Sequence, residues 1–209
     1  MTVQAAPVLS CIDAATEEQM KSEVDVVHRA GNTVGGIFEV VAHNVITGLG
    51  SHAQWDEKLD GQLARAVMSI QAVKGVEIGE GIAAATSYGS EVMDEIGYDA
   101  AAKHFTRASN RAGGLEGGIT NGEDVLVRGY LKPISTLRTP LATVDMVTKQ
   151  PISAAYERSD VCVVPAGGVA GEAMVSIILA QAMIEKFGGD SLLEMRRNFD
   201  NYAHQLKEF

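Results

Sequence analysis

Apolar residues recur at helical spacing in three parts of the chain, and this periodicity predicts three helices. The first begins at a capping box of Thr16 with Gln19 and ends at Gly31. The second begins near Lys58 and carries one apolar stripe. The third covers residues 167–187, is apolar nearly all round, and ends at a glycine pair. We therefore expect the third helix to be buried on several faces.

Shorter apolar runs predict strands at residues 3–12, 35–42, 73–78, 125–131, 143–147 and 152–156. Residues 83–104 mix small, polar and acidic types with little period, which predicts a mobile excursion. A buried helix among short strands favours an α+β fold, expected as a layered β-α-β sandwich with buried helices between antiparallel sheets. No Pro-, Ser- or charge-rich linker divides the chain, so we expect residues 1–209 to form a single domain.

The densest glycine run has five glycines in the ten residues 113–122. Glycine leaves the backbone open, so amide N–H groups there can approach a ligand directly. The strand after this run leads to Lys132, Ser135 and Thr136, one cation and two hydroxyl donors that suit a phosphate. The alternative interpretation is a glycine-rich hairpin with a solvated end.

Composition argues against several kinds of partner and site. The net charge of −10 argues against a large surface for nucleic acid or anionic membrane. The most apolar segment, residues 174–184, is shorter than the roughly 20 residues that a membrane span needs. Cys11 and Cys162 form no CxxC pair, so we expect reduced thiols of a cytoplasmic protein and no zinc site. Residues 103–138 hold six basic and three acidic side chains, which favours a small anionic ligand.

Five motifs occur in order along nearly the whole chain. They are Gly-Leu-Gly-Ser at 48–51, Met-Ser-Ile-Gln-Ala-Val-Lys-Gly-Val-Glu-Ile-Gly at 68–79, Asn-Arg-Ala-Gly-Gly-Leu-Glu-Gly-Gly at 110–118, Lys-Pro-Ile-Ser-Thr at 132–136 and Arg-Ser-Asp-Val-Cys-Val-Val-Pro at 158–165. Together these motifs closely resemble the chorismate synthase family. Five motifs in one order are far more specific than any single glycine pattern.

The resemblance implies a carbon–oxygen lyase that forms chorismate by anti-1,4-elimination of phosphate from 5-enolpyruvylshikimate 3-phosphate. It implies reduced FMN as cofactor, a homotetramer, and a cytoplasmic role in aromatic amino acid biosynthesis. Two routes for reducing the flavin stay open, the enzyme's own NADPH activity and a separate reductase. A second reading also stays open, a non-catalytic flavin- or phosphate-binding or assembly module. A dinucleotide-binding domain is disfavoured because the glycine run lacks GxGxxG spacing.

The resemblance also assigns site residues. Flavin contacts fall on Gln71, Ala72, Gly117, Lys132, Pro133, Ile134, Ser135, Thr136 and Arg158. Arg158 is expected to face the substrate as well, and Asp160 to exchange a proton with flavin N5 in a water-poor pocket.

Each of these roles has a structural alternative. Arg158 would instead pair with Glu157 or another neighbour, and Lys132 would lie on the surface at a strand end. His52, like the other four histidines, is interpreted as structural or surface.

The chain departs from the family at its start. Family members begin with Gly-Glu-Ser-His-Gly, Arg-Pro-Gly-His-Ala-Asp and Arg-Glu-Thr types of motif, and these do not occur here. We therefore expect a C-terminal portion of a chorismate synthase with an incomplete active site, which forms no chorismate by itself.

Overall fold

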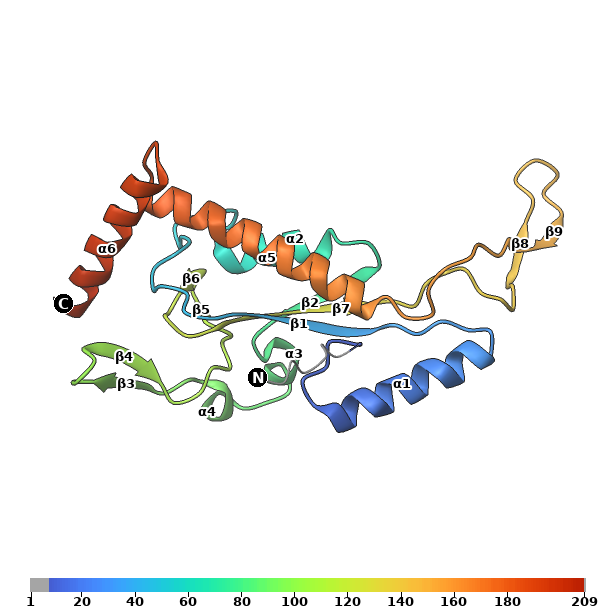
Figure 1. The fold of residues 1–209 in the computed structure, drawn as a ribbon, viewed down its shortest axis with the longest axis horizontal. Helices are drawn as coiled ribbons and strands as arrows, with labels where there is room; N and C mark the ends of the chain where they lie inside the picture. Colours follow the sequence, from blue (N-terminus) through green and yellow to red (C-terminus); the bar gives the residue numbers. More distant parts are fainter. Residues whose placement is uncertain (1–7, 209) are drawn as a thin grey trace, which may run out of the picture.

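The computed structural model describes residues 8–208, and its centre is a three-stranded antiparallel sheet. The strand order is β1 (Gly36–Ala42), β7 (Val125–Leu131) and β2 (Val73–Ile78). Helices α2 (Leu59–Met68) and α5 (Val164–Phe187) lie together over one face of this sheet (Figure 1). This sheet-and-helix pair contains the hydrophobic core.

The strands contribute alternate residues to the hydrophobic core. In β7 every second residue from Val125 to Leu131 is buried, because successive side chains of a strand point to opposite faces. Phe38 of β1 packs against Gly129 of β7 and Gly171 of α5. A side chain at either glycine would collide with the Phe38 ring, so these glycines set how closely the helix approaches the sheet.

Smaller elements surround this core. They are α1 (Ala14–Arg29), α3 (Gly81–Ala84), α4 (Gly89–Val92), β3 (Ile96–Asp99), β4 (His104–Arg107), β5 (Leu115–Glu116), β6 (Ile119–Thr120), β8 (Ala142–Val144), β9 (Pro151–Ser153) and α6 (Leu192–Glu208). Strands β3 and β4, β5 and β6, and β8 and β9 each form an antiparallel hairpin. The hairpin of β8 and β9 is the tip of an arm, residues 137–157, which extends away from the body of the molecule (Figure 1).

The α+β prediction is confirmed, and the strand predicted at 125–131 has the observed bounds. Of the strand predicted at 3–12, residues 3–7 lie outside the described part, and residues 8–12 form a turn and irregular backbone. Residues 83–104, predicted as a mobile excursion from their lack of period, contain the short helix α4 and the strand β3 of a hairpin, and their mobility stays a prediction.

The start of α1 corrects a second prediction. Asp13 caps α1, and its carboxylate accepts the Thr16 amide at 2.7 Å, so Thr16 is not the cap. Helix α6 was not predicted, although Met195, Phe199 and Tyr202 follow helical spacing. The rings of Phe199 and Tyr202 lie 5.3 and 5.6 Å from that of Phe187, which holds α6 against the end of α5.

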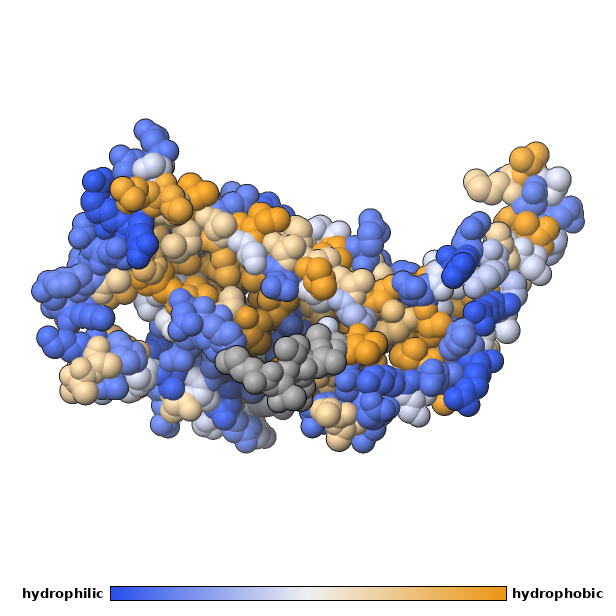
Figure 2. Space-filling model, in the orientation of Figure 1, coloured by the Kyte–Doolittle hydropathy of each residue, from blue (hydrophilic) through white to orange (hydrophobic). Residues whose placement is uncertain are grey.

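Helix α5 corrects a third prediction, because only one of its faces is buried. Val175 and Ile178 face the core, whereas Val169, Ile177 and Ile184 are more than half exposed. Figure 2 shows apolar side chains along this helix at the surface. By length and composition alone, α5 is long and apolar enough to cross a membrane. Of its most apolar stretch of 18 residues, 28% is buried inside the protein. Its packing on β1 and α2 accounts for the buried part.

Candidate functional site

Two segments at the base of the arm carry most of the predicted site residues. The outgoing segment, residues 132–136, leaves β7, and the returning segment, residues 158–162, leads into α5. The hydroxyl oxygens of Thr136 and Ser159 lie 2.8 Å apart in a hydrogen bond that joins the two segments. The arm therefore begins and ends at one place, and that place brings the Lys-Pro-Ile-Ser-Thr motif beside the Arg-Ser-Asp motif.

A linker between α1 and β1, residues 31–35, contacts both segments. The Thr33 hydroxyl donates to the Ile134 carbonyl at 2.6 Å, and the Val34 amide donates to the Val161 carbonyl at 2.9 Å. Gly35 lies so close to the Leu131 carbonyl that a Cβ would stand 2.3 Å from that oxygen. The linker thus packs tightly against the end of β7 and the start of the outgoing segment.

Gln71 and Ala72 reach the same end of the sheet. The Lys132 amide donates to the Ala72 carbonyl at 2.9 Å, which places Ala72 directly beside the outgoing segment. Ala72 has a φ of 69°, a left-handed conformation that is uncommon for alanine. The register between β2 and β7 also shifts between Val73 and Gly75, and such bulges redirect the chain near sites.

Gly117 lies at the other end of the sheet. It stands at the tip of the β5–β6 hairpin, which precedes β7, whereas Lys132 follows β7 (Figure 1). Seven strand residues separate the two ends, a length of roughly 20 Å. Gly117 and Gly118 both have positive φ, as a two-residue hairpin turn requires. Within this chain the hairpin interpretation of Gly117 therefore holds, and the structure does not bring Gly117 to the outgoing segment.

Backbone amides just before the glycine run and at its start are used inside the protein. The Asp94 carboxylate accepts the amides of Arg111 and Ala112, both at 2.9 Å, and the Ser109 hydroxyl. The Asn110 side chain accepts the Gly114 amide at 2.7 Å. The expectation that these amides approach a ligand was therefore wrong for this part of the run. Burial of Asp94 tends to raise its pKa, but the hydrogen bonds from the Ser109 hydroxyl and from the Ala112 and Arg111 amides hold the pKa below its ordinary value.

The charged side chains at the base of the arm are exposed. Lys132, Arg158 and Asp160 all lie at the surface, so Asp160 has no water-poor pocket within this chain. Among residues 8–208, neither Lys132 nor Arg158 forms an ion pair with a carboxylate. The predicted pair of Arg158 with Glu157 is therefore not formed. The Lys132 ammonium instead donates to the Pro133 carbonyl at 3.2 Å.

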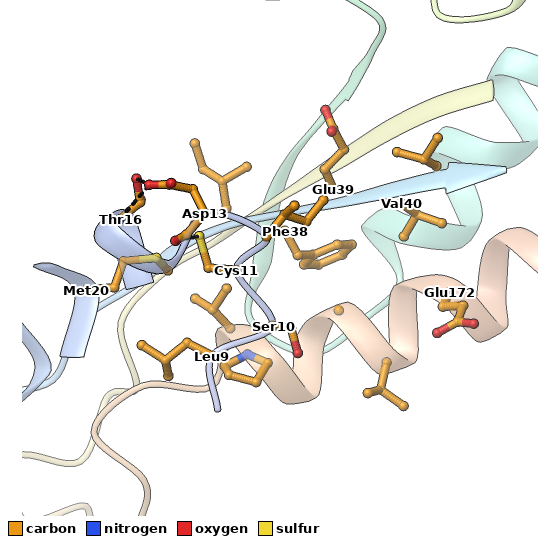
Figure 3. A pocket seen from close by; sticks show the side chains of 17 residues that line it. Leu9, Ser10, Cys11, Asp13, Thr16, Met20, Phe38, Glu39, Val40 and Glu172 are labelled. Atoms are coloured by element: carbon orange, nitrogen blue, oxygen red, sulfur yellow. Dashed lines mark hydrogen bonds between the residues drawn. The ribbon is translucent and has the colours of Figure 1, made fainter. Parts of the chain in front are cut away.

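Two open grooves lie elsewhere on the molecule. One, of about 660 Å³, runs between residues 9–13, strand β1 and helix α5; Figure 3 shows Cys11, Phe38 and Glu172 around it. The other, of about 970 Å³, lies between the β3–β4 hairpin and α6. Neither groove is lined by a predicted site residue.

The residues at the base of the arm suit a phosphorylated ligand. Lys132 and Arg158 are cations that pair with no carboxylate of residues 8–208, and Ser135 adds a hydroxyl. A phosphate needs this set of donors, and an arginine can bind it with two parallel hydrogen bonds. The donor set present in this chain therefore fits the phosphate of FMN.

Two further residues of this region, Thr33 and Ser159, were not predicted. Ser159 stands inside the Arg-Ser-Asp motif, so its position between two assigned residues was the available signal. Thr33 has no such signal, because its partner Ile134 lies 101 positions away.

Comparison with known proteins shows which family this chain resembles. The family model described as chorismate synthase matches residues 2–184. Chorismate synthase of Solibacter usitatus is 64% identical over 201 residues, which cover 96% of this chain and 52% of that protein. The enzyme of Geobacter sulfurreducens is 55% identical over 99% of this chain and 54% of its own.

A solved structure shows the same fold. The structure titled "Crystal Structure of Chorismate Synthase" superimposes with a TM-score of 0.78 at 45% identity, covering 93% of this chain and 50% of that one. The chain thus spans about half the length of the relatives that it matches. From its motifs, its fold and these matches, the chain belongs to the chorismate synthase family.

Proposed function

We propose that this chain supplies part of the flavin and substrate site of a chorismate synthase, which converts 5-enolpyruvylshikimate 3-phosphate to chorismate with reduced FMN. The observation that carries the proposal is the junction at the base of the arm, where the Thr136–Ser159 hydrogen bond joins the two motifs. Lys132 and Arg158 lie on these segments, and neither pairs with a carboxylate in the part of the chain that the structure describes. Two unpaired cations beside hydroxyl donors are typical of a phosphate site.

The proposed roles follow from residue chemistry. Lys132, Ser135, Thr136 and Arg158 hold phosphate, and the backbone of Gln71, Ala72, Pro133 and Ile134 lines the flavin. Arg158 also stabilises the leaving phosphate, because positive charge is most useful where negative charge develops. Bound reduced FMN supplies an acceptor for the substrate's ring hydrogen. The Asp160 carboxylate takes up and releases the proton that is exchanged in the reaction. Gly117 remains a prediction from the resemblance.

Flavin titration tests the proposal. We expect the chain to bind FMN saturably, with an affinity at least about tenfold higher than for riboflavin, which lacks the phosphate. Lys132→Ala and Arg158→Ala should each weaken FMN binding by about tenfold at low salt, since each removes a charge-assisted hydrogen bond. Fluorescence quenching of the flavin measures all four affinities.

A matched control separates a site from general attraction. Lys149 is an exposed cation at the tip of the arm, so Lys149→Ala should leave FMN affinity unchanged. Equal affinities for FMN and riboflavin, or equal losses in all three variants, would contradict a phosphate site at the base of the arm.

Asp160 has its own test in a chorismate synthase of full family length that carries this sequence. Asp160→Asn should keep FMN affinity and lower turnover by about 100-fold, because the amide cannot exchange the proton. A coupled assay of chorismate formation measures turnover. Near-normal turnover would remove Asp160 from the proposed mechanism.

The second candidate function is a non-catalytic assembly module. The exposed apolar side chains of α5, with Met146 and Val147 at the tip of the arm, favour it. Absence of any flavin binding would support this candidate over the first. Under either function the proposed assembly is a homo-oligomer, a tetramer as the family resemblance implies, in the cytoplasm. Because the chain spans half of its relatives, we also propose that it forms no chorismate by itself.

A further inference from the structure

The linker of residues 31–35 is the one described segment that bonds to both sides of the base of the arm. Its Thr33 hydroxyl holds the Ile134 carbonyl, and its Val34 amide holds the Val161 carbonyl. The Gly31 carbonyl additionally accepts the Arg138 amide at 3.1 Å, where the arm begins. Helix α1 and strand β1 anchor the two ends of the linker. The linker therefore connects the rigid body of the protein to the outgoing and the returning segment together.

Thr33 provides the only side-chain bond among these contacts to the Lys-Pro-Ile-Ser-Thr motif. The bond is 2.6 Å long and partly buried, so water competes with it less than at an open surface. Its acceptor is the carbonyl of the Ile134–Ser135 peptide bond, so this hydrogen bond sets the orientation of the peptide directly before Ser135. The Asn32 side-chain oxygen accepts a hydrogen bond from the Thr33 amide at 2.8 Å, so the backbone of Thr33 is held as well as its side chain.

We propose that Thr33 is a positioning residue for phosphate binding, which rests on the proposed function. Its hydroxyl holds residues 132–136 in the conformation that presents the Lys132 ammonium and the Ser135 and Thr136 hydroxyls to one phosphate. Thr33 does not touch the ligand. Its effect passes through the Ile134 carbonyl, and the Val34 contact aligns Arg158 with the same phosphate.

Two substitutions at one position test this inference. Thr33→Val keeps the shape and removes the donor, whereas Thr33→Ser keeps the donor. We expect Thr33→Val to raise the Kd for FMN about fivefold and Thr33→Ser to change it by less than about twofold. In Thr33→Val the Kd for riboflavin should rise less than the Kd for FMN, because riboflavin keeps only the ring contacts of this segment and has no phosphate for it to hold.

Hydrogen exchange gives a readout that needs no ligand. In Thr33→Val the amides of Lys132 and of residues 134–136 should exchange faster than in the wild type, and in Thr33→Ser they should not. If the wild-type chain binds neither flavin, the proposed function fails, and this exchange result still decides whether Thr33 orders the segment.

Three results would overturn the inference. One is FMN affinity in Thr33→Val equal to that of the wild type. Another is an equal loss of FMN and riboflavin affinity, which would indicate general destabilisation. The third is unchanged amide exchange at Lys132 and residues 134–136 in Thr33→Val.

Discussion

Gly171→Ala is expected to lower the free energy of unfolding by about 2–3 kcal/mol, although alanine normally favours a helix over glycine. A Cβ at position 171 would stand 2.3 Å from the Phe38 ring, and a Cβ at Gly129 would meet the same ring from β7 at 2.3 Å. The ring is thus enclosed between strand and helix, and α5 would have to move outward. Urea denaturation followed by circular dichroism measures the loss.

Gly168 in the same helix is a matched control. A Cβ there would lie 3.7 Å from Phe38, an ordinary contact, so Gly168→Ala should stabilise the protein by up to about 1 kcal/mol. Adding Phe38→Leu should recover part of the loss in Gly171→Ala, because the smaller side chain leaves room. Equal stabilities of the two alanine variants would show that the helix does not depend on this close approach.

Glu77→Gln is expected to cost about 2–3 kcal/mol at neutral pH, because the Glu77 carboxylate is buried and fully used. It accepts hydrogen bonds from the Tyr130 hydroxyl, from Arg128 and, at 2.8 Å, from the Ile82 amide. Glu39 pairs with Arg128 from the other side at 2.6 Å but is more exposed, so Glu39→Gln should cost at most about 1 kcal/mol. Chemical denaturation of both variants makes this comparison.

The pH dependence of stability follows from the same contacts. Burial tends to raise the pKa of Glu77, but the bonds from Tyr130, Ile82 and Arg128 together lower it below its ordinary value of 4.5. A lowered folded pKa means that the stabilisation is complete above pH 4.5 and is lost as the pH falls through the folded value. The difference between wild type and Glu77→Gln should therefore shrink below about pH 4.5. A difference that is constant down to pH 3 would contradict this.

Local sequence pattern predicted those elements whose burial repeats along the chain. Strand β7 was predicted with its observed bounds because the core covers alternate residues from end to end. Helix α2 was predicted because Leu59, Leu63 and Val67 follow one stripe, and all three are fully buried. The extent of α5 was also predicted within a few residues, but its burial was not. Composition specifies how apolar a helix is, whereas its neighbours decide which faces water reaches.

For the candidate site too, the sequence predicted the residue types but not all of their contacts. The motifs singled out Lys132, Ser135, Thr136 and Arg158, because phosphate chemistry needs cations and hydroxyls in any fold. At the start of the glycine run Asn110 takes up the Gly114 amide, and just before the run Asp94 takes up the Arg111 and Ala112 amides, so these amides are not open to a ligand. The Asp94 contacts arise only when residue 94 folds back on the turn, whereas the Asn110 contact spans only four positions.

The sequence by itself determined the family, the main strands and helices, and the residue types of a phosphate site, since these depend on local periodicity and on motifs. The tertiary structure alone decided which of those residues meet. It joined Thr136 to Ser159 and Thr33 to Ile134, and it left Gly117 at the far end of β7. The physical reason is that such contacts depend on strand order and on the packing of distant segments, which no local pattern encodes.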